Sequence, residues 1–112
     1  MARSPSAPIT VYDNGDLKVY PDVASACADL EVYDIDDLTI FDGQGYRLRV
    51  ETHGQSVTGM SIAADIAPAA SDLEAKLKAF ISQVGPDRVG LPDVEAASLS
   101  SALEALLRFF QS

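Results

Sequence analysis

The sequence is short of the side chains on which most protein chemistry depends. Among its 112 residues it has no tryptophan, one histidine and one cysteine. The lone cysteine, Cys27, has no second cysteine with which to form a disulfide or a zinc site, and this usage fits a reducing cytoplasm. No run approaches the roughly 18 consecutive apolar residues of a membrane helix, and residues 1–8 lack the apolar stretch of a secretory signal. These absences predict a soluble cytoplasmic protein that does not enter a membrane.

Basic residues are also scarce. Eight Lys and Arg residues stand against 17 Asp and Glu residues, which gives a net charge of −9. This balance argues against nucleic acid as a partner, because binding to phosphates requires Lys and Arg. The deficit is local: from Asp13 to Asp42, nine acids accompany Lys18 alone, a net charge of −8. Such a surface attracts a basic partner, although net charge also keeps a small protein in solution.

Catalytic groups are equally few. The single histidine, His53, falls at the end of a predicted strand, and no carboxylate is distinguished as its partner. The turn Gly43-Gln44-Gly45 follows a strand but leads into another strand, so it lacks the helix N-terminus that binds phosphate. Cys27 falls on the apolar stripe of a short helix and is interpreted as a core residue. The sequence therefore predicts a protein that is not an enzyme and that has no cofactor and no metal.

The central structural feature is a predicted β-hairpin over residues 38–50, in which apolar and polar side chains alternate. Gly43-Gln44-Gly45 joins its two arms, because glycine adopts the positive φ that a short hairpin loop needs. The turn and the apolar pattern together set the register. The predicted pairs are Asp42 with Tyr46, Ile40 with Leu48, and Leu38 with Val50.

Shorter signals predict the other strands and the first helix. The dipeptide Asn14-Gly15 between two alternating stretches predicts a hairpin over residues 9–20, since it adopts the φ angles of a tight turn. A short helix is expected to begin at Pro21-Asp22. Its apolar stripe consists of Val23, Cys27 and Leu30. A fifth strand is expected at residues 57–63, followed by a linker at residues 65–70.

Two amphipathic helices are predicted over residues 71–112. Their apolar residues recur at i, i+4, i+7, i+8 and i+11. These residues are Leu73, Leu77, Phe80, Ile81 and Val84 in the first helix, and Leu99, Leu103, Leu106, Leu107 and Phe110 in the second. Ser71 and Gly85-Pro86 mark the limits of the first helix, and Pro92-Asp93 marks the start of the second. The short connection predicts antiparallel packing, with separate docking of each helix on the sheet as the alternative.

Together these elements predict a single α+β domain over residues 9–112, preceded by a disordered arm at residues 1–8. The expected architecture is an antiparallel sheet of four to five strands with the C-terminal helical pair packed on it, in the order β-β-α-β-β-(β)-α-α. Residues 9–64 supply the sheet and its one short helix, and residues 71–112 supply the pair. The pattern leaves open which face of the sheet the helices cover.

The best candidate for a binding site is the acidic segment that leads into the central hairpin. Its carboxylates offer the right chemistry for the positive groups of a partner. These candidates are Asp34, Asp36, Asp37 and Asp42. Their spacing lacks the central glycine and the closing glutamate of a calcium loop. A solvated acidic loop with no partner is the alternative.

Aromatic residues suggest two secondary contacts. On the predicted register Phe41 lies opposite Arg47, with Arg49 further along the same arm, and an aromatic ring beside a cation forms a contact surface if the helices leave it uncovered. If the helices cover that face, Phe41 is a core residue. Phe109 points about 100 degrees away from Phe110 on the helical wheel. It either widens the buried face of the last helix or contacts a second chain.

Several features occur in a fixed order between residues 9 and 64. They are the turn Asn14-Gly15-Asp16, a strand ending at Tyr20, a short alanine-rich helix, and the segment Phe41-Asp42-Gly43-Gln44-Gly45-Tyr46-Arg47-Leu48. This order resembles small, acidic, mostly uncharacterised bacterial proteins, some of which are similar to the immunity partners of polymorphic toxins. The resemblance implies a non-enzymatic binding protein and assigns a role to no individual residue.

Three hypotheses follow. The first is an immunity-type protein-binding module that neutralises a basic partner through the acidic segment between Asp13 and Asp42. The second is a small-molecule-binding or enzyme-like domain with a pocket between sheet and helices, to which His53 or Tyr33 contributes. The third is a homodimer formed through the C-terminal helix, and the sequence leaves monomer and homodimer both open.

Overall fold

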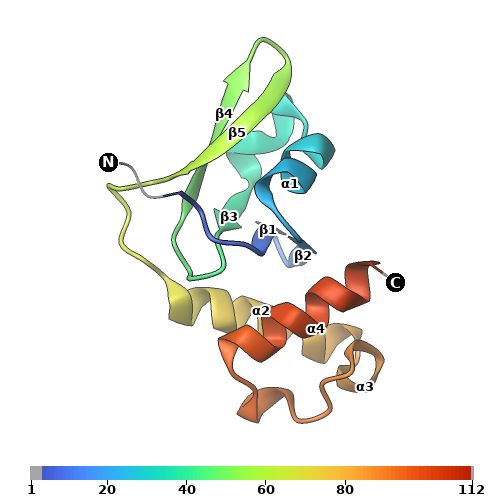
Figure 1. The fold of residues 1–112 in the computed structure, drawn as a ribbon. Helices are drawn as coiled ribbons and strands as arrows, with labels where there is room; N and C mark the ends of the chain where they lie inside the picture. The colour runs from blue at the N-terminus through green and yellow to red at the C-terminus, as the bar shows by residue number, and fades with distance from the viewer. Residues whose placement is uncertain (1–3, 112) are drawn as a thin grey trace.

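Two hydrophobic cores lie on opposite faces of a small three-stranded sheet in the computed structural model, which describes residues 4–111 (Figure 1). The sheet has the order β2-β1-β3 and is antiparallel throughout. Its strands are β1 (Ile9–Asp13), β2 (Asp16–Tyr20) and β3 (Thr39–Phe41). Because successive side chains of a strand point to opposite faces, each strand contributes to both cores.

The hairpin of β1 and β2 is confirmed as predicted. Asn14 and Gly15 have φ angles of 47° and 98°, and they join the closing pair Asp13 and Asp16. Two successive positive φ angles give the turn whose twist matches the two strands that it connects. The local Asn-Gly signal is therefore sufficient to specify this hairpin.

The first core lies between the sheet and the C-terminal helices. Leu17, Val19 and Phe41 point from the sheet into it, and Phe41 is fully buried. The helices thus cover the face that carries Phe41, which settles the alternative that the sequence left open. Phe41 is a core residue rather than part of an exposed contact surface.

The second core lies on the other face of the sheet. There the sheet contributes Ile9, Val11, Tyr20 and Ile40. The covering elements are α1 (Val23–Asp29), β4 (Leu48–His53) and β5 (Ser56–Ile62). Ala26 of α1 is fully buried in this core, and the predicted stripe of Val23, Cys27 and Leu30 is partly buried around it. The expected fifth strand is present as β5, which forms a separate two-stranded sheet with β4.

The predicted register of the central hairpin is confirmed at its turn and is wrong along its arms. The Asp42 N–H donates to the Tyr46 carbonyl at 2.9 Å, and Phe41 forms an isolated antiparallel bridge with Arg47, as the register predicts. Beyond this point the arms separate. Instead of pairing with each other, Ile40 pairs with Val11, Leu48 with Ile62, and Val50 with Met60. The strands therefore form two antiparallel sheets rather than the predicted single sheet.

The C-terminal helices keep the predicted apolar stripes but differ at one boundary. They are α2 (Ala70–Val84), the short α3 (Pro86–Val89) and α4 (Leu99–Gln111). The predicted start of the last helix at Pro92-Asp93 is wrong, because Val94–Ala96 form only a 3-10 turn, η2. The Ser98 hydroxyl accepts from the Ser101 N–H at 3.1 Å, which is the capping contact that begins α4.

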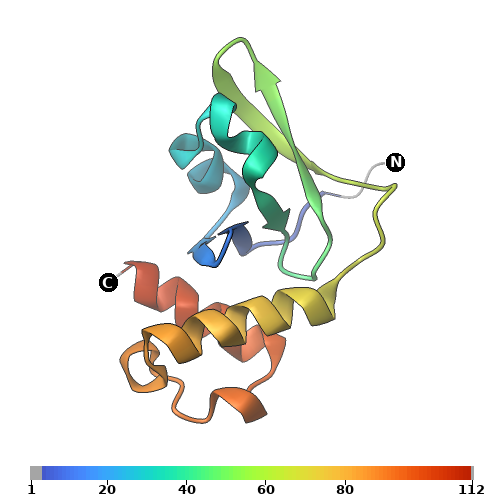
Figure 2. The ribbon, with the colours of Figure 1, turned by 180° about the vertical axis from the view of Figure 1, so that it is seen from behind.

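The predicted antiparallel packing of these helices is also wrong. In two views that differ by 180°, α2 and α4 run in the same general direction (Figures 1 and 2). Phe80 and Phe110, both late in their helices, have ring centroids 5.8 Å apart, which agrees with this arrangement. The connection through α3 and η2 leads the chain back past the length of α2 before α4 begins, so α4 repeats its direction.

Two remaining segments complete the chain. The predicted connection between α1 and β3 is a 3-10 helix, η1 (Val32–Asp37). Within the predicted N-terminal arm, the Ser6 N–H donates to Asp42 and the Ser6 carbonyl accepts from the Gly43 N–H at 2.7 Å, so the chain is attached to the central turn there. Residues 1–3 of that arm, and residue 112 of the predicted last helix, lie outside the described residues.

Candidate protein-binding surface

The 3-10 helix η1 presents one apolar side inward and its polar side to solvent. A 3-10 helix has three residues per turn, so side chains three apart lie in line. Val32, Ile35 and Leu38 have this spacing and are partly buried. The residues between them are exposed: Tyr33, Asp34, Asp36 and Asp37. The segment is thus an ordered 3-10 helix with an acidic outer face.

Tyr33 is the most exposed large side chain of apolar character among the described residues, at 80% of its full accessibility. It borders a hollow of about 450 Å³ between the start of η1 and the turn that joins β4 to β5. The hollow is lined by Leu30, Glu31, Val32, Tyr33 and Gln55. An aromatic ring beside an apolar hollow is a common anchor point in protein interfaces.

The carboxylates around Tyr33 have no cationic partner in the part of the chain that the structure describes. The four ion pairs found there are Lys18 with Asp29, Arg49 with Asp65, Lys76 with Asp72, and Lys78 with Glu74. None involves Glu31, Asp34, Asp36 or Asp37. Moreover, residues 21–46 contain no Lys or Arg. The negative potential of this surface is therefore not neutralised from within residues 4–111.

Asp42 does not belong to this surface, although the sequence groups it with the other three candidates. It is fully buried, and its Oδ1 accepts from the N–H groups of Gln44 and Tyr46 at 2.9 Å each. Its Oδ2 accepts from the Ser6 N–H at 3.1 Å. A partner cannot reach this carboxylate. Its role is to hold the turn between β3 and β4.

The secondary contact residues are dispersed in the structure. Arg47 lies over the buried Phe41 ring, with the guanidinium carbon 5.7 Å from the ring centroid. Arg49 is exposed and is paired with Asp65. Phe109 is partly buried and packs edge-on against Phe110 at 5.3 Å. These four residues therefore do not form one continuous contact surface.

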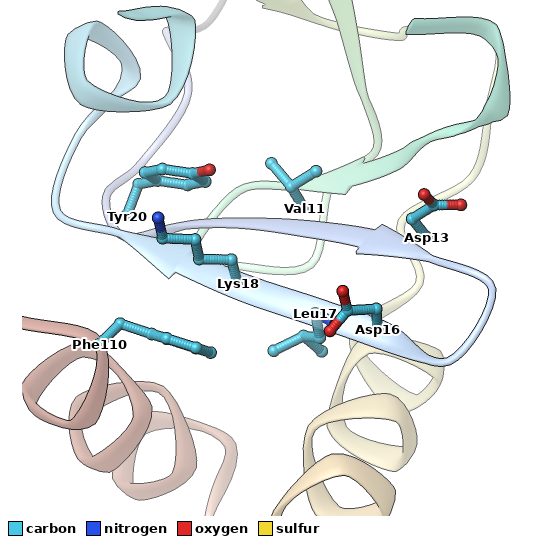
Figure 3. A pocket seen from close by; sticks show the side chains of 7 residues that line it. All are labelled: Val11, Asp13, Asp16, Leu17, Lys18, Tyr20 and Phe110. Atoms are coloured by element: carbon cyan, nitrogen blue, oxygen red, sulfur yellow. The ribbon is translucent and has the colours of Figure 1, made fainter. Parts of the chain in front are cut away.

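A second hollow, of about 480 Å³, lies where the sheet meets the end of α4 (Figure 3). It is lined by Val11, Asp13, Asp16, Leu17, Lys18, Tyr20 and Phe110. The sequence predicts a small-molecule pocket in such a position, with His53 or Tyr33 contributing. Neither residue lines this hollow, and His53 is instead exposed at the end of β4.

Three side chains beside this second hollow form a hydrogen bond and an ion pair with one another. The Tyr20 hydroxyl donates to Asp29, and the Lys18 ammonium lies 3.4 Å from the same carboxylate. Burial, and then the bond to Asp29, raise the pKa of Tyr20, so it stays protonated. The hydrogen bond from Tyr20 lowers the pKa of Asp29, which therefore stays ionised. These contacts connect α1 to β2. Neither Tyr20 nor Asp29 has a pKa shifted toward neutral pH, as a general base would need.

Other chemically reactive groups are isolated. Burial, and then the nearby Glu51 charge, raise the pKa of Cys27, which disfavours the thiolate. Among residues 4–111, no three His, Cys, Asp or Glu side chains lie close enough to hold a metal ion. No helix within that range is long and apolar enough to cross a membrane.

Comparison of the chain with protein-family models, with curated proteins and with solved structures gives no match.

The surface around Tyr33 was only partly visible in the sequence. Asp34, Asp36 and Asp37 stand out as a cluster, but Leu30 and Gln55 carry no signal that assigns them to this surface. The spacing of Val32, Ile35 and Leu38 is the pattern that reveals an ordered element there. Gln55 joins the surface only because the β4-β5 turn reaches η1, a contact that no local pattern encodes.

Proposed function

We propose that this protein is a non-catalytic protein-binding module of the immunity type, which binds a basic protein partner. The contact region, called here the Tyr33 surface, consists of the η1 residues Tyr33, Asp34, Asp36 and Asp37 together with the adjacent Leu30, Glu31, Val32 and Gln55. The observation that carries the proposal is the 80% exposure of Tyr33 among carboxylates that have no cationic partner within residues 4–111.

The chemistry of the Tyr33 surface selects the partner. Unpaired carboxylates accelerate the approach of a positively charged protein and disfavour an acidic one. An Arg side chain of the partner can stack on the Tyr33 ring while it donates to a neighbouring carboxylate. The apolar lining from Leu30 and Val32 gives the contact a desolvated centre. Acidic residues supply the on-rate and the orientation, and Tyr33 supplies the anchor.

The test is affinity capture by the full chain from a lysate of its native cells, with identification of the retained proteins. We expect a basic protein that is retained at about 50 mM salt and released at about 300 mM salt, since screening weakens contacts between charges. The variant D34N/D36N/D37N should lose that protein. Tyr33→Ala should lose it as well, although the net charge of the chain does not change.

A matched control carries the same charge change elsewhere. Asp87, Asp93 and Glu104 are exposed in the helical part of the chain, and the variant D87N/D93N/E104Q should retain the partner. The proposal is wrong if the wild type retains no basic protein. It is also wrong if the control and the D34N/D36N/D37N variant lose the partner to the same extent, because the attraction would then follow net charge alone.

A further inference from the structure

Strand β2 is an edge strand with an open hydrogen-bonding side. It pairs with β1 only, as the sheet order β2-β1-β3 shows. The two-residue turn closes on the hydrogen-bonded pair Asp13 and Asp16, so hydrogen-bonded and non-hydrogen-bonded pairs alternate from there. Leu17 and Val19 consequently direct their backbone N–H and C=O groups away from β1. In residues 4–111 no other strand meets these groups.

The hollow shown in Figure 3 lies along this open edge. Four of its seven lining residues belong to β2: Asp16, Leu17, Lys18 and Tyr20. Leu17 points to the face of the sheet that α2 and α4 cover, whereas Lys18 and Tyr20 belong to the opposite face. A hollow that touches side chains from both faces of one strand must lie at the edge of that strand. Phe110 borders it from the end of α4.

The charges on β2 restrict which strand can pair with this edge. Asp16 and Lys18 are both exposed and lie two residues apart on the same face. A lysine in an edge strand opposes pairing with strands of arbitrary sequence. Lys18 is paired with Asp29 of its own chain, whereas Asp16 has no cationic partner within residues 4–111. A suitable strand must place a positive group opposite Asp16 and a negative group opposite Lys18.

We infer that the occupant of this edge is β2 of a second copy of the chain, related by a two-fold axis at Leu17. Antiparallel pairing with Leu17 opposite Leu17 of the second copy places each Asp16 opposite the other copy's Lys18. One symmetric register thus gives each Asp16 a cationic partner and each Lys18 a second carboxylate besides its own Asp29. The two three-stranded sheets become one six-stranded sheet, and both helical layers lie on the same face.

The backbone contacts of this register agree with the single chain. Leu17 is among the residues whose N–H and C=O point outward, so the central pair is hydrogen-bonded in both directions. In the isolated chain the Leu17 N–H donates to the Asp16 carboxylate at 3.0 Å. On pairing, this N–H transfers to the Leu17 carbonyl of the second copy and Asp16 turns to Lys18. The sequence-based hypothesis assigned a homodimer to the last helix, whereas the geometry points to β2.

The test is sedimentation equilibrium of the full chain from about 10 µM to about 1 mM, because association depends on protomer concentration. We expect a concentration-dependent rise from the 11.9 kDa monomer to twice that mass. Lys18→Asp places like charges opposite each other and should raise the dissociation constant at least about tenfold. Asp29→Asn removes the ion pair of Lys18 within one chain without placing like charges across the interface, and it should associate like the wild type. The swapped variant D16K/K18D should restore association, since each new lysine again faces a carboxylate.

Two controls identify the interface. Arg88→Asp makes the same charge change at an exposed site remote from β2 and should associate like the wild type. Amide exchange of Leu17 should slow as concentration rises, whereas that of Lys18, which faces β1, should not change. A monomer at all concentrations overturns the inference. So does a dimer that Phe109→Ala abolishes and Lys18→Asp leaves intact, because that dimer uses the helix.

Discussion

Removal of the buried Asp42 carboxylate should destabilise the fold more than any other single acidic substitution. The side chain is fully buried and accepts three backbone N–H bonds, from Ser6, Gln44 and Tyr46. A hydrogen bond to a charged group contributes about 1.5 to 3 kcal/mol, and three such bonds to one group are not additive. Asp42→Ala is therefore expected to lower the free energy of unfolding by about 3 to 5 kcal/mol, a large part of the stability of a domain of this size.

Asp42→Asn separates the bonds from the charge. An asparagine oxygen in the Oδ1 position still accepts from Gln44 and Tyr46, but its amide group faces the Ser6 N–H and cannot accept from it. We expect a loss of about 1 to 2 kcal/mol, less than for alanine. Asp36→Ala, an exposed control, should change the free energy of unfolding by less than about 0.5 kcal/mol.

The assay is urea denaturation followed by far-ultraviolet circular dichroism, since the chain has no tryptophan to report by fluorescence. The order of losses should be alanine, then asparagine, then the Asp36 control. Equal losses for Asp42→Ala and Asp42→Asn would contradict this role of Asp42, because the Oδ1 bonds would then contribute nothing. A loss for Asp42→Ala as small as for Asp36→Ala would refute it too.

Two further predictions concern the same fold. Gly45 has φ of 91°, and an added Cβ would lie 2.5 Å from the Ala70 Cα. Gly45→Ala should therefore lower the free energy of unfolding, measured by urea denaturation, by at least about 2 kcal/mol. Gly15→Ala, with φ of 98° and open space around it, should lower it by only about 1 kcal/mol, and equal losses would contradict the importance of the Ala70 contact. The hydrogen bond from Tyr20 lowers the pKa of Asp29, so the ionised Asp29 stabilises the fold above its unfolded pKa near 3.9. This stabilisation is lost as the pH falls below that value. The melting temperature of Tyr20→Phe should therefore fall less than that of the wild type between about pH 5 and about pH 2. Parallel acid profiles of the two proteins would contradict this role of Tyr20.

The elements that the sequence predicts well are those with local determinants. The hairpin at Asn14-Gly15 follows from the backbone preferences of two residues, and the stripes of α2 and α4 follow from spacing within each helix. The sequence places the start of α4 too early, because Pro92-Asp93 is a stronger start signal than Ser98, the residue that supplies the cap.

The elements that the sequence predicts poorly depend on which segments meet. Alternation at residues 38–50 indicates which side chains share a face but not which strand pairs with which. β3 pairs with β1, whose sequence lies about 30 residues away, and β4 pairs with β5. Proximity along the chain favours pairing of β3 with β4, but the structure retains this pairing only next to the turn, in the Asp42–Tyr46 hydrogen bond and the bridge of Phe41 to Arg47.

The candidate binding residues divide on the same principle. Asp34, Asp36 and Asp37 remain exposed because η1 directs Val32 and Ile35 inward. Asp42 was grouped with them by its charge, yet it is buried by its contacts with Ser6, Gln44 and Tyr46. Charge alone does not distinguish a carboxylate that binds a partner from one that caps backbone donors. The distinction requires the donors, which come from within the turn, from the residue that follows it and from the N-terminal segment.

The Tyr33 surface and the edge of β2 share no residue, and this separation has a consequence for binding. A homodimer paired through β2 would carry two Tyr33 surfaces, one from each copy. A partner with two basic sites, or two linked partners, would then bind with an effective concentration set by the geometry of the dimer. Lys18→Asp should therefore leave the intrinsic affinity of each Tyr33 surface unchanged while it removes the gain from bivalency. Loss of one-to-one binding in that variant would show instead that the partner contacts β2 directly.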